Sequence, residues 1–270
     1  MHNSHMPNMP LLRPAAVAGL FYPSGAEELR ATVEHLLKDV PESGGVTPKA
    51  VIAPHAGYIY SGPVAASVYR HLTPLNGRVR RVILLGPAHR VAVRGLALPA
   101  ADAFATPLGP VPVDADAVEA LRSLPQVSER ADVHAQEHSL EVQLPFLQQV
   151  LGEFSLVPLV VGDASAEEVA EVLQVLWGGD ETLIVVSSDL SHYHEYGVAQ
   201  RMDRSTSAAI ESLRYEDIGY EQACGRAPIS GLLLEARQRG LHARLVDLRN
   251  SGDTAGPRDH VVGYGAYVLS

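Results

Sequence analysis

The chain has 270 residues, of which 46% are hydrophobic and 19% charged, a composition that excludes a disordered or fibrous protein. Its 21 lysines and arginines are outnumbered by 31 aspartates and glutamates, for a formal net charge of −10, and such a surface repels phosphate backbones and anionic lipids, so no nucleic-acid or membrane partner is expected. The single cysteine excludes an internal disulfide and fits a reducing compartment, which predicts a cytoplasmic protein.

The N-terminus and the lengths of the apolar runs indicate how the chain is organised. Residues 1–9 have no periodicity and are expected to form a loose tail or the remnant of a cloning tag. No apolar run approaches the roughly 18 residues of a membrane span. The apolar patch at 15–20 has prolines on both sides and does not make a signal peptide. Because we find no internal repeat and no polar linker, residues 10–270 are predicted to form one domain.

Apolar runs of strand length alternate with amphipathic stretches of helix length, which is typical of an α/β protein. In chain order, the elements that we predict are strand 49–53, helix 62–72, strands 81–85 and 94–98, a proline-rich loop 99–112, helix 114–124 with Asp114 as its N-cap, helix 138–151, strand 154–161, helix 165–177, strand 182–187, helices 199–213 and 229–239, the latter ended by Gly240, and paired edge strands 241–248 and 261–269. The expected fold is a central mixed, largely parallel sheet flanked by helices.

Chemically versatile side chains follow three of the predicted strands. His55 and His89 each come just after a buried strand, and Asp189 and His192 follow strand 182–187. The carboxyl ends of strands in open α/β sheets form the crevice in which ligands bind. A single histidine after a strand is usually an ordinary loop residue. Three such sites together favour a divalent metal, since neutral imidazole suits iron, zinc, nickel and copper.

Acidic residues surround a further histidine in the segment 136–141, which opens the predicted helix 138–151. One interpretation is helix capping, in which Glu137 and Glu141 complement the positive end of the helix dipole. The other makes this turn a wall of the pocket, where it holds metal-bound water or the imidazole of a metal ligand, with His138 beside it. The sequence leaves both interpretations open.

The residues after strand 182–187 also allow more than one interpretation. Asp189 could orient His192 as a general acid or base near neutral pH. Alternatively, His192 or His194 could complete a zinc site with His55 and His89, as in a hydrolase, although no His-Glu-x-x-His motif is present.

Cys224 stands just before predicted helix 229–239, two residues from Arg226. A lone cysteine is more often a small buried residue, but a helix N-terminus and a nearby arginine favour the thiolate that a metal binds. The chain contains no dinucleotide fingerprint, P-loop or Gly-x-Ser-x-Gly elbow, so NAD, ATP and serine-hydrolase chemistry are not expected.

Five segments together resemble the Memo family in sequence and order. They are Ala-Pro-His-Ala-Gly-Tyr at 53–58, Leu-Gly-Pro-Ala-His at 85–89, Glu-His-Ser-Leu-Glu-x-Gln-Leu-Pro-Phe at 137–146, Ser-Ser-Asp-x-x-His at 187–192 and Cys-Gly-Arg-x-Pro-Ile at 224–229. The resemblance extends from Arg13 to Gly265. That family includes the B component of the bacterial AmmeMemoRadiSam grouping, and its vertebrate members are associated with cell-motility signalling through protein partners.

The resemblance implies a fold like that of the class III extradiol dioxygenases, which are non-haem Fe(II) enzymes that open catechol rings. By position, His55 and His89 are similar to the two metal-binding histidines, and Cys224 is similar to the cysteine that Memo proteins place as third ligand. The dioxygenases use a glutamate there. Because a thiolate is softer, it favours Cu(I) or zinc or alters the iron potential. Fe(II) is the expected cofactor, with copper or zinc as alternatives.

The resemblance further implies catalytic roles. His192 is similar to the acid/base histidine of the dioxygenases, with Asp189 and His138 nearby in the pocket. The expected function is that of a non-haem iron-dependent, dioxygenase-like oxidoreductase that acts on an unidentified small substrate. The alternative is a non-catalytic metal-handling module, or one that binds a peptide or an unidentified partner protein in the same pocket.

Overall fold

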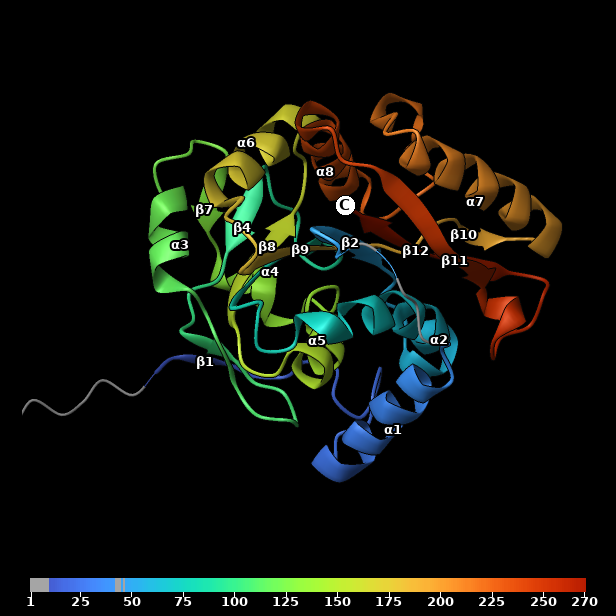
Figure 1. The fold of residues 1–270 in the computed structure, drawn as a ribbon, viewed down its shortest axis with the longest axis horizontal. Coiled ribbons are helices and arrows are strands. Elements are labelled where there is room, and N and C mark those ends of the chain that lie inside the picture. The colour runs from blue at the N-terminus through green and yellow to red at the C-terminus, as the bar shows by residue number, and fades with distance from the viewer. Residues whose placement is uncertain (1–9, 42–44, 46) are drawn as a thin grey trace, which may run out of the picture.

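A nine-stranded sheet forms the centre of the protein in a computed structural model that describes residues 10–41, 45 and 47–270 (Figure 1). The tail expected at 1–9 lies outside these residues. The strand order is β10-β12-β2-β9-β3-β8-β4-β7, with β11 paired to β12. The bounds are β2 Ala50–Ala53, β3 Arg81–Pro87, β4 Leu96–Leu98, β7 Val127–Glu129, β8 Ser155–Val161, β9 Thr182–Ser187, β10 His192–His194, β11 Ala243–Asn250 and β12 Val261–Leu269.

The sheet is parallel at its centre, and the strand direction changes toward both ends, where β4 and β7 are parallel to each other but antiparallel to the centre. Strands β2, β9, β3 and β8 run parallel, whereas β12 pairs antiparallel with β2 and β4 pairs antiparallel with β8. The central strands are buried along nearly their whole length, which explains why they are continuous apolar runs. The expected mixed, largely parallel sheet is thus confirmed. The predicted pairing of the last two strands is also confirmed, since β11 and β12 are antiparallel neighbours.

Different helices cover the two faces of the sheet (Figure 1). On β2, Val51 contributes to the hydrophobic core with α1, α2 and α5, whereas its neighbour Ile52 contributes to the core with α3, α6, α8 and the end of α7. The helix bounds are α1 Ala26–Lys38, α2 Tyr58–Tyr69, α3 Ala115–Leu121, α4 Ala131–Ala135, α5 Leu144–Leu151, α6 Ala166–Leu176, α7 Tyr196–Glu211 and α8 Arg226–Arg239. Among the described residues, no helix is long and apolar enough to cross a membrane.

Two predicted helix ends are confirmed, whereas the helix predicted at 114–124 already ends at Leu121 and the one predicted at 138–151 begins late. The Asp114 side chain accepts the Ala117 N–H as an N-cap, and Gly240 ends α8 in the left-handed conformation. The helix predicted at 138–151 is α-helical only from Leu144, after one 3₁₀ turn at 141–143. Before that turn, the Glu137 carboxylate accepts the backbone N–H groups of His89 and Ser139, and the Ser139 hydroxyl donates to the Pro87 carbonyl.

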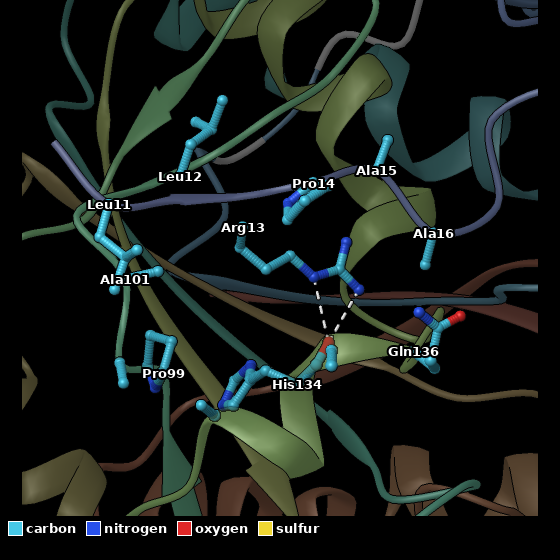
Figure 2. Close-up of a pocket in the computed structure, with 13 residues that line it drawn as sticks. Leu11, Leu12, Arg13, Pro14, Ala15, Ala16, Pro99, Ala101, His134 and Gln136 are labelled. Carbon is cyan, nitrogen blue, oxygen red and sulfur yellow. Dashed lines mark hydrogen bonds between the residues drawn. The ribbon is translucent and has the colours of Figure 1, made fainter. Parts of the chain in front are cut away.

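The loop predicted at 99–112 contains two short strands that hold the N-terminal segment. Strands β5 (Ala103–Phe104) and β6 (Val111–Pro112) pair with each other, and β5 also pairs with β1 (Leu12–Arg13). This small sheet places Arg13 beside the last turn of α4, where its guanidinium reaches the His134 carbonyl (Figure 2).

Candidate metal centre

Three central strands deliver candidate ligands to one edge of the sheet. Strands β2, β9 and β3 are parallel neighbours in that order, so their carboxyl ends meet. His55 lies two residues after β2, His89 two residues after β3, and Asp189 two residues after β9. The arrangement forms the sheet-edge site that the spacing of these residues predicts.

A third imidazole joins the two strand-end histidines. His138, from the segment before α5, stacks on His89 with ring centroids 4.6 Å apart, and His55 lies 5.1 Å from His89 and 5.5 Å from His138. One ring nitrogen from each of the three lies within 4.8 Å of the others. His55 is buried, whereas 27% of the His89 side chain is exposed, so solvent reaches the cluster from the His89 side.

Hydrogen bonds determine which nitrogen of His55 is free. The Ser187 hydroxyl donates to the Ser139 carbonyl at 2.6 Å, so its oxygen accepts from His55 Nδ1 at 2.8 Å. Gln143 also donates to this oxygen. Burial, followed by the neighbouring histidines, lowers the pKa of His55 well below 6.5. The neutral ring therefore carries its proton on Nδ1 and leaves the Nε2 lone pair available.

A carboxylate orients His89 in the same way. Glu137 Oε1 lies 2.8 Å from His89 Nδ1, and Oε2 accepts the His89 backbone N–H at 2.5 Å. Burial raises the pKa of Glu137, but its hydrogen bonds to His89 and Ser139 outweigh this effect and bring the pKa to about 2. Because an ionised carboxylate only accepts, His89 Nδ1 must donate and Nε2 is free. A carboxylate behind a histidine is the usual arrangement around a metal ligand.

A glycine allows the Glu137 segment to approach β3. At Gly86, a Cβ atom would lie 2.8 Å from Ser139 Oγ and 2.9 Å from Leu140 Cδ2. Ser139 then donates to the Pro87 carbonyl at 2.9 Å. Glu137 reaches His89 only because this position lacks a side chain. Of the two interpretations of segment 136–141, the structure thus favours the pocket wall for Glu137.

The imidazole of His138 contains a buried nitrogen that lacks a hydrogen-bond partner. His138 Nδ1 is buried without one, at 3.5 Å from Glu137 Oε1. Burial is the largest influence on His138 and lowers its pKa, so the neutral ring offers a lone pair. Buried polar atoms are nearly always paired, and one ring nitrogen of His138 lies within 4.8 Å of one from each of the other two histidines, so His138 fits a further metal ligand.

Cys224 lies at the side of the cluster. Its Sγ is 3.4 Å from His55 Nε2 and accepts the Asp189 N–H at 3.3 Å. A Cβ atom at Gly225 would lie 2.6 Å from the Ser188 Cβ, so glycine is needed for the start of α8 to approach the end of β9 this closely. The predicted cysteine therefore contacts the His55 ring, but among the described residues it does not belong to the group whose ligand atoms all lie within 4.8 Å of one another.

The expectation that Arg226 favours the Cys224 thiolate is wrong. The Arg226 guanidinium donates to the Ile218 carbonyl at 2.6 Å and lies over the Tyr220 ring, 4.2 Å from its centroid. Burial, together with the Asp189 carboxylate, raises the pKa of Cys224 to about 12. The side chain is therefore a thiol at neutral pH, and a cation bound at Sγ would have to displace its proton.

Asp189 and His192 lie on the side of the cluster nearest β10. The Asp189 carboxylate is buried and accepts the His55 backbone N–H at 2.8 Å, so it fixes the backbone that carries His55. His192 is half-buried on β10, close enough that its charge affects both His55 and Asp189. The catalytic roles expected of His192, Asp189 and His138 stay predictions.

Ser187, which binds the His55 ring, and Gln143, which donates to Ser187, were not predicted as site residues. Ser187 ends a buried strand and opens the segment 187–192, which also carries the family resemblance. Gln143 belongs to the segment 137–146 that carries the family resemblance, and this was the available signal. Within the described part of the chain, the Glu141 carboxylate binds the N-terminal segment from Arg13 to Tyr22 rather than the three histidines.

Comparison with known proteins identifies the family. A family model described as Memo-like protein matches residues 13–268. The chain belongs to the Memo family. A MEMO1 family protein of Aquifex aeolicus is 36% identical over 264 residues, covering 94% of this chain and 97% of the relative. One from Ignicoccus hospitalis is 37% identical over 281 residues, covering 95% and 98%.

A solved structure shares the fold. The crystal structure of the uncharacterized protein JW3007 from Escherichia coli K12 aligns with this Memo-family protein at a TM-score of 0.52 and 15% identity, covering 81% of this chain and 98% of the other. At that identity the likeness concerns the fold alone.

In this Memo-family protein, three imidazoles beside one thiol fit a transition metal, because magnesium and calcium prefer oxygen ligands.

Proposed function

We propose that this Memo-family protein binds iron(II) through His55, His89 and Cys224, with His138 as a further imidazole, and uses the centre as an oxidoreductase on a small substrate. The observation that carries the proposal is the orientation of the first two histidines. Ser187 and Glu137 accept hydrogen bonds from Nδ1 of His55 and of His89, respectively, so the Nε2 lone pair of each ring stays available. Nε2 of His55 also lies beside the thiol of Cys224. Such a set of nitrogen and sulfur ligands suits iron, copper and zinc.

The surrounding residues suit chemistry at a bound metal. An iron ion would supply redox chemistry and Lewis acidity at the open side of the cluster. His89 and His138 border that side, with 27% and 15% of their side chains exposed. His192 on β10 would transfer a proton to or from a substrate bound there, since an imidazole can act as a general acid or base. Asp189 would hold the His55 backbone throughout.

The thiol favours a second candidate, a metal-handling protein without turnover. Cys224 Sγ lies only 3.4 Å from the free nitrogen of His55, and thiolate with imidazole suits Cu(I) and zinc. Under this candidate the same residues bind a metal tightly, and oxygen is not consumed with any substrate.

Anaerobic loading with Fe(II), Zn(II) or Cu(I) in separate experiments tests the proposal. Metal content per chain is measured for wild type, His55→Ala and Cys224→Ser, with His35→Ala as a control, because His35 is exposed on α1. We expect about one ion per chain in wild type and in the control, a large loss of every metal in His55→Ala, and a loss in Cys224→Ser that is greatest for Cu(I). No bound metal in wild type would refute the centre.

Oxygen uptake then separates the two candidates. Iron-loaded wild type is compared with His192→Ala across a panel of catechols and related small reductants. Uptake that depends on iron and on His192 supports the oxidoreductase. Stoichiometric metal binding with no uptake supports metal handling.

A further inference from the structure

A buried arginine lies behind the candidate metal centre. Only 5% of the Arg13 side chain is exposed, and the carboxylate of Glu141, with which it pairs, is fully buried. Arg13 Nε and Nη2 donate to the His134 carbonyl at 3.0 and 2.9 Å, and Figure 2 shows both bonds. Nη2 also donates to the Glu137 carbonyl at 2.6 Å. The guanidinium thus holds two backbone carbonyls and one carboxylate in a fixed geometry, as its planar fork allows.

Glu141 ties the rest of the N-terminal segment to the same place. Its carboxylate accepts the Ala16 N–H at 2.8 Å, the Val17 N–H at 2.9 Å and the Tyr22 hydroxyl at 2.6 Å. A buried charge with this many partners is costly to disturb, because any partner left behind is unpaired in a poorly solvated place. The path of the chain from Arg13 to Tyr22 is therefore coupled to the segment before α5.

The contact with Glu137 leads directly to the imidazole cluster. The carbonyl that Arg13 holds belongs to the peptide bond between Glu137 and His138. On one side of that peptide, the Glu137 carboxylate clamps both the ring and the backbone of His89. On the other side is His138, whose ring stacks on His89. One peptide plane thereby orients two of the three imidazoles.

We propose that Arg13 is a positioning residue of the metal centre, holding the Glu137–His138 peptide so that the nitrogens of His89 and His138 converge. The inference rests on the proposed function, since it concerns the same centre. Arg13 lies at the edge of a cavity of about 350 Å³, bordered by the N-terminal segment and by residues 134–136 (Figure 2). Its removal therefore leaves room for water at the freed carbonyls rather than a closed void.

Cobalt(II) is the probe for the test, because its visible absorption reports ligand geometry as well as occupancy. The double variant Arg13→Met/Glu141→Gln removes both buried charges together, so no carboxylate is left without its cation. We expect it to bind Co(II) about tenfold more weakly than wild type, at the low end of the 10–100-fold cost of removing residues that orient metal ligands, with a shifted absorption spectrum.

A second arginine–glutamate pair, with an equally buried carboxylate and a more exposed arginine, controls for general destabilisation. Glu235 is buried and accepts from Arg239 Nε at 2.5 Å near the end of α8. Arg239→Met/Glu235→Gln should lower the melting temperature but leave Co(II) affinity and spectrum at wild-type values. If the Arg13 double variant fails to fold, Arg13→Lys replaces it. The lysine keeps the charge beside Glu141 but lacks the fork that reaches the Glu137 carbonyl, so weaker binding and a shifted spectrum are again expected.

The outcomes distinguish the positioning role from the metal centre itself. Wild-type affinity and spectrum in a folded Arg13 variant would overturn the positioning role and leave the centre intact. An equal loss of affinity in the Arg239 control would also overturn it. Failure of wild type to bind Co(II) would overturn the centre, and the positioning role with it.

Discussion

Replacing Glu137 with glutamine should weaken metal binding while leaving the fold in place. The carboxylate accepts three N–H groups, from the His89 ring at 2.8 Å, the His89 backbone at 2.5 Å and the Ser139 backbone at 2.9 Å. If the glutamine oxygen takes the Oε1 position, it keeps the bonds from the His89 ring and the Ser139 backbone, and the amide nitrogen faces the His89 backbone N–H. If the oxygen takes the Oε2 position instead, the bonds from the His89 ring and from Ser139 are lost.

The expected loss of stability follows from the number of N–H groups that Glu137→Gln leaves without an acceptor. One unmet buried donor costs about 1–3 kcal/mol, which we expect as a loss in the free energy of unfolding of Glu137→Gln. Loss of the negative charge also makes His89 a poorer ligand. Residues that orient metal ligands typically contribute a factor of about 10–100 in metal affinity. We therefore expect Zn(II) affinity to fall by about that factor.

Competition with a chromogenic chelator measures the affinity, and urea denaturation measures stability. Asp114→Asn is the matched control, because the Asp114 carboxylate also accepts three hydrogen bonds, from Ala117, Arg81 and Ser155, at the start of α3. The control should lose stability and keep its Zn(II) affinity. Zn(II) affinity within twofold of wild type in Glu137→Gln would refute the reasoning.

Three further predictions follow. Cys224→Ser should weaken Cu(I) binding by more than tenfold and Fe(II) binding by less, since a hydroxyl is a hard ligand; equal losses in anaerobic competition would contradict this. Burial lowers the pKa of His134 to about 4, below its unfolded value of 6.5, so its contribution to stability is present above pH 6.5 and is lost as the pH falls toward 4. This contribution to the free energy of unfolding is about 3 kcal/mol. Urea denaturation at several pH values should therefore show that the stability of His134→Asn falls less steeply between pH 6.5 and 4 than that of wild type. The same pH dependence in both proteins would contradict this. Gly86→Ala should place a methyl group against Ser139, cost about 1–3 kcal/mol and reduce Zn(II) affinity, whereas Gly45→Ala, with nothing within 4 Å, should change neither.

The strand ends of the candidate site could be predicted because the central strands are continuous apolar runs. The run before His55 and the run before His89 are buried on both faces, and parallel neighbours necessarily end at one edge. Helix α1 was equally predictable, since Leu29, Val33 and Leu37 recur every four residues on its buried face. We did not predict it.

The contacts that orient the histidines depend on approaches between distant segments. Periodicity favours a helix from residue 138, yet the Glu137 and Ser139 side chains bind backbone groups of His89 and Pro87 instead. The side-chain direction of Arg226 likewise depends on Ile218 and Tyr220, so sequence proximity to Cys224 misleads. A local sequence pattern does not predict whether a long side chain such as that of Arg226 contacts its sequence neighbour Cys224 or residues brought close by the fold.

The most direct test of the metal centre is X-ray absorption at the zinc edge of protein loaded with one equivalent of Zn(II). Ligation by the imidazoles of His55, His89 and His138 and by Cys224 predicts nitrogen scatterers at about 2.0–2.1 Å with imidazole outer shells, and one sulfur at about 2.3 Å. The sulfur shell should disappear in Cys224→Ser. A spectrum of oxygen scatterers without imidazole shells would contradict the account.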